Sequence, residues 1–122
     1  EIGMAGGGDP DNRRMMMWEG LNTHQTQLRE TVRRLLQIRR ENISLRRGRR
    51  VTVTGGIDTF AYKLTGCGNT EDVYVFVNRS DTDTSIAGLP SGNWMELVTN
   101  TPTSGGNPVS VPARSLRIFK VQ

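Results

Sequence analysis

The chain has 122 residues, of which 34% are apolar and 23% charged, and its formal net charge is +4. This length suits one modest domain, and no run of about 18 apolar residues occurs, so we expect no membrane partner. The single cysteine, Cys67, excludes an internal disulfide framework and a multi-cysteine metal site; we read it as a turn residue and expect no cofactor.

Residues 1 to 20, EIGMAGGGDPDNRRMMMWEG, have too little apolar periodicity for a helix and too much glycine for a strand. They predict a loop of defined shape. Met15, Met16, Met17 and Trp18 add a large apolar surface that this segment cannot bury by itself. We therefore expect that further structure precedes the chain. No signal in these residues assigns a cellular compartment.

Residues 22 to 42 predict one amphipathic helix. Asn22 or Thr23 can cap its start, and Gly48 follows as a stop. The predicted apolar stripe consists of Leu28, Val32, Leu35, Leu36 and Arg39. Since no second helix follows, we expect the four apolar members to dock on the sandwich or on a second copy of the chain. Left exposed, this helix face would favour self-association.

From Val51 onward the pattern changes to seven short alternating runs separated by Gly, Asn, Asp and Pro. The runs are 50–54, 59–65, 72–78, 84–88, 94–98, 108–112 and 115–121. In the third run both faces are apolar, which predicts a central strand. The charge also divides here, because residues 1 to 50 carry a net +5 and residues 51 to 122 a net −1. The predicted fold is mainly β: an N-terminal loop and one helix, then an antiparallel β-sandwich.

The opening loop resembles the segment after the eighth barrel strand in the α-amylase family of glycoside hydrolases, above all in neopullulanases, cyclomaltodextrinases, maltogenic amylases and α-glucosidases. The resemblance rests on a Glu, then Asp-Pro-Asp-x-Arg-Arg, then Met and Trp. The matching positions are Glu1, Asp9, Pro10, Asp11, Arg13, Arg14, Met17 and Trp18. The run LLQIRRENISLRRG resembles the last barrel helix, and VYVFVNRS resembles the central strand of the C-terminal sandwich, domain C. Met15 departs from the Pro or Asp that is frequent in these relatives.

The resemblance implies a division into residues 1–48, the last barrel loop and helix, and residues 49–122, the sandwich domain. It implies a parent enzyme that cleaves α-glucosidic bonds with retention on a (β/α)₈ barrel. The family's catalytic carboxylates come from earlier barrel strands, so the chain alone is expected to be inert and to need the missing barrel domain as its partner. Asp9 and Arg13 match positions that contact the sugar of an α-glucan or maltooligosaccharide. Glu1 matches a position that anchors the turn.

Three alternatives compete with this interpretation. Asp9, Arg13 and Arg14 can instead brace a glycine-rich loop without touching a ligand. The sandwich can be a stand-alone structural or carbohydrate-binding module that stacks sugars on Tyr62, Tyr74 and Trp94. The third is nucleic-acid binding through the basic helix.

For nucleic acid, Arg29, Arg33 and Arg40 share a helix face and can neutralise phosphates, but Glu30 and Glu41 interrupt the charge. We therefore expect no nucleic-acid partner. His24 stands alone near the helix start and predicts neither catalysis nor metal binding. The sequons at Asn42 and Asn78 permit glycosylation only in a secretory pathway.

Overall fold

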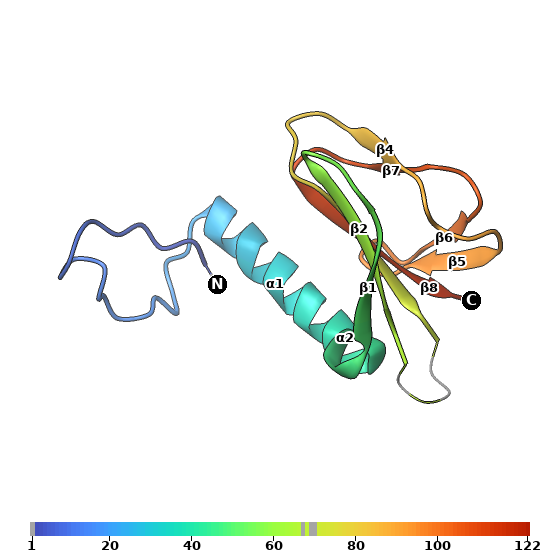
Figure 1. Cartoon of the computed structure of the whole chain (residues 1–122). Helices are drawn as coiled ribbons and strands as arrows, with labels where there is room; N and C mark the ends of the chain where they lie inside the picture. The colour runs from blue at the N-terminus through green and yellow to red at the C-terminus, as the bar shows by residue number, and fades with distance from the viewer. Residues whose placement is uncertain (1, 67, 69–70) are drawn as a thin grey trace. The chain divides into compact units, whose positions relative to one another are not determined.

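The computed structural model describes residues 2–66, 68 and 71–122 (Figure 1). These residues form two compact units, which meet in sequence between Gln37 and Ile38. This point lies inside the long helix α1 (Thr23–Glu41), whereas the first strand begins at Arg49. The sequence predicts a division between residues 48 and 49, and this division remains a prediction. Glu1 and Cys67 lie outside the described residues.

Helix α1 begins where the sequence predicts it. The side-chain oxygen of Asn22 accepts a hydrogen bond from the backbone N–H of Gln25 (2.9 Å), and the Gln25 side chain accepts one from the Asn22 N–H (3.0 Å). This reciprocal pair satisfies donors that the first helical turn leaves without partners inside the helix. Asn22 is therefore the cap.

The apolar stripe of α1 differs from the prediction. The one buried side chain of α1 is Ile38, at 2% exposure, which the predicted stripe omitted. Arg39, which the stripe included, is exposed, and its guanidinium donates to the backbone oxygen of Leu45. Leu28 and Leu36 remain 41% and 58% exposed. Self-association through these side chains stays a prediction.

A one-turn helix, α2 (Ser44–Arg47), connects α1 to the first strand. It ends at Gly48, whose N–H donates to the Ser44 oxygen (2.9 Å). A Cβ atom at residue 48 would lie only 2.5 Å from that oxygen, so glycine is required by the close approach of the backbone. None of the helices in the described part of the chain has the length and apolar character needed to cross a bilayer.

The rest of the chain is antiparallel β-structure. The strands are β1 (Arg49–Gly55), β2 (Thr59–Thr65), β3 (Val73–Asn78), β4 (Thr84–Ile86), β5 (Asn93–Glu96), β6 (Thr101–Ser104), β7 (Val109–Val111) and β8 (Ser115–Val121). Seven of them match the predicted runs. The sequence pattern missed β6, a four-residue strand that contains Pro102. Because β6 is an edge strand of its sheet, it can carry a proline, which weakened the sequence signal.

The strands form a six-stranded sheet in the order β1-β2-β3-β8-β5-β6 and a two-stranded sheet of β4 and β7 (Figure 1). The predicted antiparallel β-sandwich is thereby confirmed. Strand β3 lies inside the larger sheet between β2 and β8, and four of its first five residues are buried. Its central position is confirmed as well.

The core of the sandwich is one cluster of buried apolar side chains. The rings of Phe76 and Phe119 meet edge to face with centroids 5.5 Å apart, and those of Tyr74 and Trp94 do so at 5.1 Å. The Trp94 indole N–H donates to the Pro90 oxygen (2.8 Å), so the ring is buried with its polar atom satisfied. The cluster consists of Ala61, Tyr74, Phe76, Ile86, Leu89, Trp94, Val111 and Phe119.

The sandwich also buries two polar side chains, Glu96 and Asn78. The Glu96 carboxylate accepts hydrogen bonds from the backbone N–H groups of Val98 (3.0 Å), Thr99 (2.7 Å) and Ile118 (3.2 Å), and from the Thr99 hydroxyl. Burial alone raises the pKa of Glu96, but the hydrogen bonds outweigh it, first those from Thr99, and the pKa lies below its ordinary value. This carboxylate organises the β5–β6 turn.

Candidate functional site

The loop at residues 9 to 14 holds the two side chains that the sequence assigned to sugar binding. Nε of Arg13 lies 2.7 Å from Oδ1 of Asp9. Both side chains are largely exposed, at 77% for Arg13 and 62% for Asp9. The backbone N–H of Arg13 donates to the Pro10 oxygen (3.0 Å), so a tight turn brings the two residues together.

This pair has the chemistry of a hydroxyl-binding site. The ion pair uses one carboxylate oxygen and Nε, which leaves the second oxygen as an acceptor and the terminal guanidinium nitrogens as donors. A planar guanidinium beside a carboxylate can therefore bond two neighbouring hydroxyls of one sugar ring. An exposed ion pair of this kind contributes little to stability, so a purely structural role gains little from it.

Arg14 differs from Arg13 although the two are adjacent. Its Nε donates to the backbone oxygen of Asp11 (3.1 Å). Arg14 therefore braces the loop, as the structural alternative proposed, while Arg13 pairs with a side chain. In the same segment Met15 and Trp18 are 89% and 78% exposed, so the apolar surface noted in the sequence stays uncovered in this chain.

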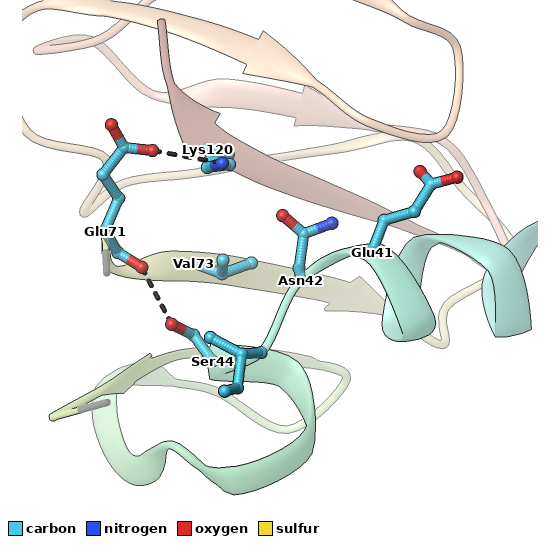
Figure 2. Close-up of a pocket in the computed structure, with 7 residues that line it drawn as sticks. Glu41, Asn42, Ser44, Glu71, Val73 and Lys120 are labelled. Atoms are coloured by element: carbon cyan, nitrogen blue, oxygen red, sulfur yellow. Dashed lines mark hydrogen bonds and ion pairs between the residues drawn. The ribbon is translucent and has the colours of Figure 1, made fainter. Parts of the chain in front are cut away.

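A cavity of about 270 Å³ lies where the end of α1 and the start of α2 meet β3 and β8 (Figure 2). Nζ of Lys120 lies 3.2 Å from Oε2 of Glu71, and the buried Ser44 hydroxyl donates to the Glu71 backbone oxygen (2.9 Å). Sequence reasoning did not find this cavity, because its lining comes from three separate stretches of the chain. The lining residues are Glu41, Asn42, Ile43, Ser44, Glu71, Val73 and Lys120. Charges of both signs line it without an aromatic ring, which indicates no ligand class.

The aromatic side chains proposed for sugar stacking are mostly in the core. Trp94 is 4% exposed and Tyr74 is 7% exposed, so neither offers a face to a ligand. Tyr62 is partly buried, and the guanidinium carbon of Arg50 lies 6.0 Å from its ring centroid. Trp94 and Tyr74 were wrong as stacking candidates because both side chains belong to the buried core cluster of the sandwich.

The basic helix is paired with acid in the structure. Arg29 and Arg33 lie 3.8 and 3.6 Å from carboxylate oxygens of Glu30. Two of the three arginines thought to neutralise phosphates thus share one negative partner, although exposed pairs at these distances are weak. Among the described residues, no three His, Cys, Asp or Glu side chains cluster in a way that could hold a metal ion.

The side-chain amides of the two sequon asparagines, Asn42 and Asn78, are engaged in hydrogen bonds. The Asn78 side chain is 1% exposed, and its amide nitrogen donates to the backbone oxygens of Thr82, Val111 and Pro112. The Asn42 amide donates to the Ile38 oxygen (2.8 Å). In the folded chain both amides serve the structure.

Comparison with known proteins finds relatives by sequence and by fold, but no family model. No family model matches the chain. A cyclomaltodextrinase of Geobacillus thermopakistaniensis (strain MAS1) is 33% identical over 100 residues, which is 78% of this chain and 16% of the relative. The chain therefore spans about a sixth of that protein's length.

Solved structures agree in fold. The α-amylase of Geobacillus thermoleovorans, solved in complex with acarbose, superposes over 100% of this chain with a TM-score of 0.83 and 21% identity; the match covers 28% of that protein. A maltogenic amylase from S. marinus superposes over 100% of this chain, with a TM-score of 0.72 and 23% identity, and 16% of that protein is covered. These structural matches show a shared fold, and the 33% sequence identity to the cyclomaltodextrinase agrees with the resemblance of the chain to the α-amylase family of glycoside hydrolases.

Proposed function

From this relationship we propose that the chain is the C-terminal piece of a retaining, α-glucan-active glycoside hydrolase. In this proposal it supplies one substrate-binding loop and the β-sandwich, and the barrel that carries the catalytic carboxylates is its partner. The chain by itself is then inert. Its share of the related cyclomaltodextrinase, 16% of the length, suits a part of such an enzyme.

The exposed Asp9–Arg13 pair is the observation that carries the proposal. Its atoms stand 2.7 Å apart in a loop that resembles a substrate loop of the family, and both side chains are open to a ligand. Two adjacent sugar hydroxyls would bond to the second Asp9 oxygen and to the terminal nitrogens of Arg13. In the transition state these bonds would hold the ring beside the catalytic carboxylates that the barrel supplies.

Asp9→Asn in the full-length protein encoded by the source gene tests this role. The substitution keeps the size of the side chain but removes the charge that pairs with Arg13. Since a hydrogen bond to a charged group is worth about 1.5–3 kcal/mol, we expect kcat/KM for maltotriose to fall about 10- to 100-fold. Asp11→Asn in the same loop is the matched control, because Asp11 bonds Arg14 through its backbone oxygen, which the substitution keeps.

A full-length protein without activity on any maltooligosaccharide would contradict the assigned enzyme class. An active enzyme in which Asp9→Asn and Asp11→Asn behave alike would contradict the role of Asp9 while leaving the class intact. The 122-residue chain assayed alone should release no glucose or maltose from maltotriose; turnover by this chain would contradict its proposed inertness.

A further inference from the structure

A second pocket, of about 250 Å³, lies at the turn between β1 and β2, next to the end of β3. It falls within the sandwich unit and was not found by sequence reasoning. Ligand pockets for drug-sized molecules span roughly 300 to 1,000 Å³, so this one suits a single small ring. Its lining residues are Gly56, Ile57, Asp58, Thr59, Phe60, Val77 and Arg79.

One side of the pocket is an ordered carboxylate–guanidinium pair. Nε of Arg79 lies 2.9 Å from Oδ1 of Asp58, and the Arg79 backbone N–H donates to the Asp58 backbone oxygen at the same distance. Two links thus hold the residues together, although they are 21 positions apart in sequence. The Asp58 side chain is 47% exposed and the Arg79 side chain 71%, so the second Asp58 oxygen and the terminal nitrogens of Arg79 can bond a ligand.

The other side of the pocket is apolar. Phe60 is partly buried, and its ring lies against the backbone of Gly55, where a Cβ atom would stand 3.6 Å from it. The rings of Phe60 and Tyr62 have centroids 5.7 Å apart, which fixes the Phe60 ring from a second direction. Ile57, at the tip of the turn, is 90% exposed. A preordered ring and an exposed aliphatic chain therefore stand beside the charged pair.

We propose that this pocket, the hairpin pocket, binds one glucosyl ring of an α-glucan chain as a non-catalytic site on the sandwich. A sugar ring has an apolar face of C–H groups and an edge of hydroxyls. The apolar face packs on Phe60 and Ile57, and neighbouring hydroxyls bond the Asp58–Arg79 pair. The choice of glucan as the sugar rests on the proposed function; the shape and chemistry of the pocket do not.

The sandwich contains a matched pair for comparison. Nε of Arg114 lies 2.7 Å from Oδ1 of Asp81, and these side chains are 69% and 81% exposed. The geometry thus resembles that of Asp58 and Arg79. Neither residue lines the hairpin pocket, and Arg114 acts on the pocket carboxylate Asp58 only through its charge, so the Asp81–Arg114 pair should not bind a sugar ring on its own.

The test is a titration of the 122-residue chain with maltotriose, followed by amide ¹H–¹⁵N chemical shifts. We expect saturable shifts in residues 56 to 60 and at Arg79. Arg79→Gln should weaken binding about tenfold, because it removes a charged donor, and Phe60→Leu should weaken it by several fold. Arg114→Gln should change the dissociation constant by less than twofold. Ile57→Ser, at an exposed turn position, is a further variant that leaves the fold intact and should also weaken binding.

The proposal would be overturned if the unmodified 122-residue chain and the three pocket variants, Arg79→Gln, Phe60→Leu and Ile57→Ser, bound maltotriose equally well. Shifts that glycerol reproduces at the same hydroxyl concentration, or shifts confined to other residues, would overturn it as well. These outcomes are separate from a failure of the enzyme assignment, because that assignment is measured by turnover of the full-length protein. An active enzyme whose sandwich ignores maltotriose would retain the proposed function and lose the hairpin pocket.

Discussion

The loop at residues 9 to 14 and the sandwich use their polar side chains in opposite ways. In the loop, Asp9 and Arg13 form a solvent-exposed ion pair, and each has further oxygen or nitrogen atoms that can hydrogen-bond a ligand. In the sandwich, Glu96 and Asn78 are fully buried and direct their bonds to neighbouring backbone groups. Since a buried polar group must be satisfied while an exposed one has water as an alternative, burial separates structural polar residues from those open to a ligand.

The largest effect should come from the buried amide. Asn78→Ala would leave three backbone oxygens and the Ser80 N–H without their side-chain partner. We expect the free energy of unfolding to fall by about 3 kcal/mol, measured by urea denaturation.

Asn42→Ala is the control for this substitution. The Asn42 side chain is only partly buried and makes one bond, to the Ile38 oxygen, so its loss should cost about 1 kcal/mol or less. Equal losses for the two substitutions would contradict the link between burial and structural role.

A smaller effect, and one that depends on pH, is expected for Glu96. Its pKa is lower in the folded chain than the ordinary 4.5, so the carboxylate adds stability above about pH 4.5. This contribution is lost as the pH falls through the folded pKa. Glu96→Gln should cost about 1–3 kcal/mol at pH 7 and should flatten the loss of stability below pH 4.5. Urea midpoints measured between pH 7 and pH 3 give both quantities.

Some acid sensitivity should remain in Glu96→Gln. The pKa of Asp72 is also lowered, mainly by a hydrogen bond from Thr65, and its pairing with Lys63 adds to this. An unchanged acid slope in Glu96→Gln would show that Glu96 has an ordinary pKa in the folded chain, and the assigned role of its hydrogen bonds would fail.

The smallest effect on stability belongs to the loop. Asp9→Asn removes an exposed ion pair, and we expect the free energy of unfolding to change by less than about 0.5 kcal/mol. The same substitution should have a large effect on turnover by the full-length enzyme. A loss of stability comparable to that of Asn78→Ala would instead support the structural reading of the loop.

Local patterns predicted much of the fold. The cap at Asn22, the helix that follows it and seven strands depend on neighbours within a few residues, and the apolar residues on both faces of β3 marked it as central. Asp9 and Arg13 were named through the resemblance of the loop to the α-amylase family, and the structure pairs these two residues, which are four positions apart.

The remaining features depend on which segments meet. Ile38 was missed because burial is decided by what packs on a side chain, and β6 because a short edge strand with a proline has a weak local signal. The pairing of β2 with β3 sets Phe60 opposite Val77. Asp58 directly precedes β2 and Arg79 directly follows β3, so the same pairing brings their side chains together. The sequence by itself determined the long helix and seven of the strands, because helix and strand periods are local; the hairpin pocket was decided by tertiary structure, because strand pairing joins residues far apart in the chain.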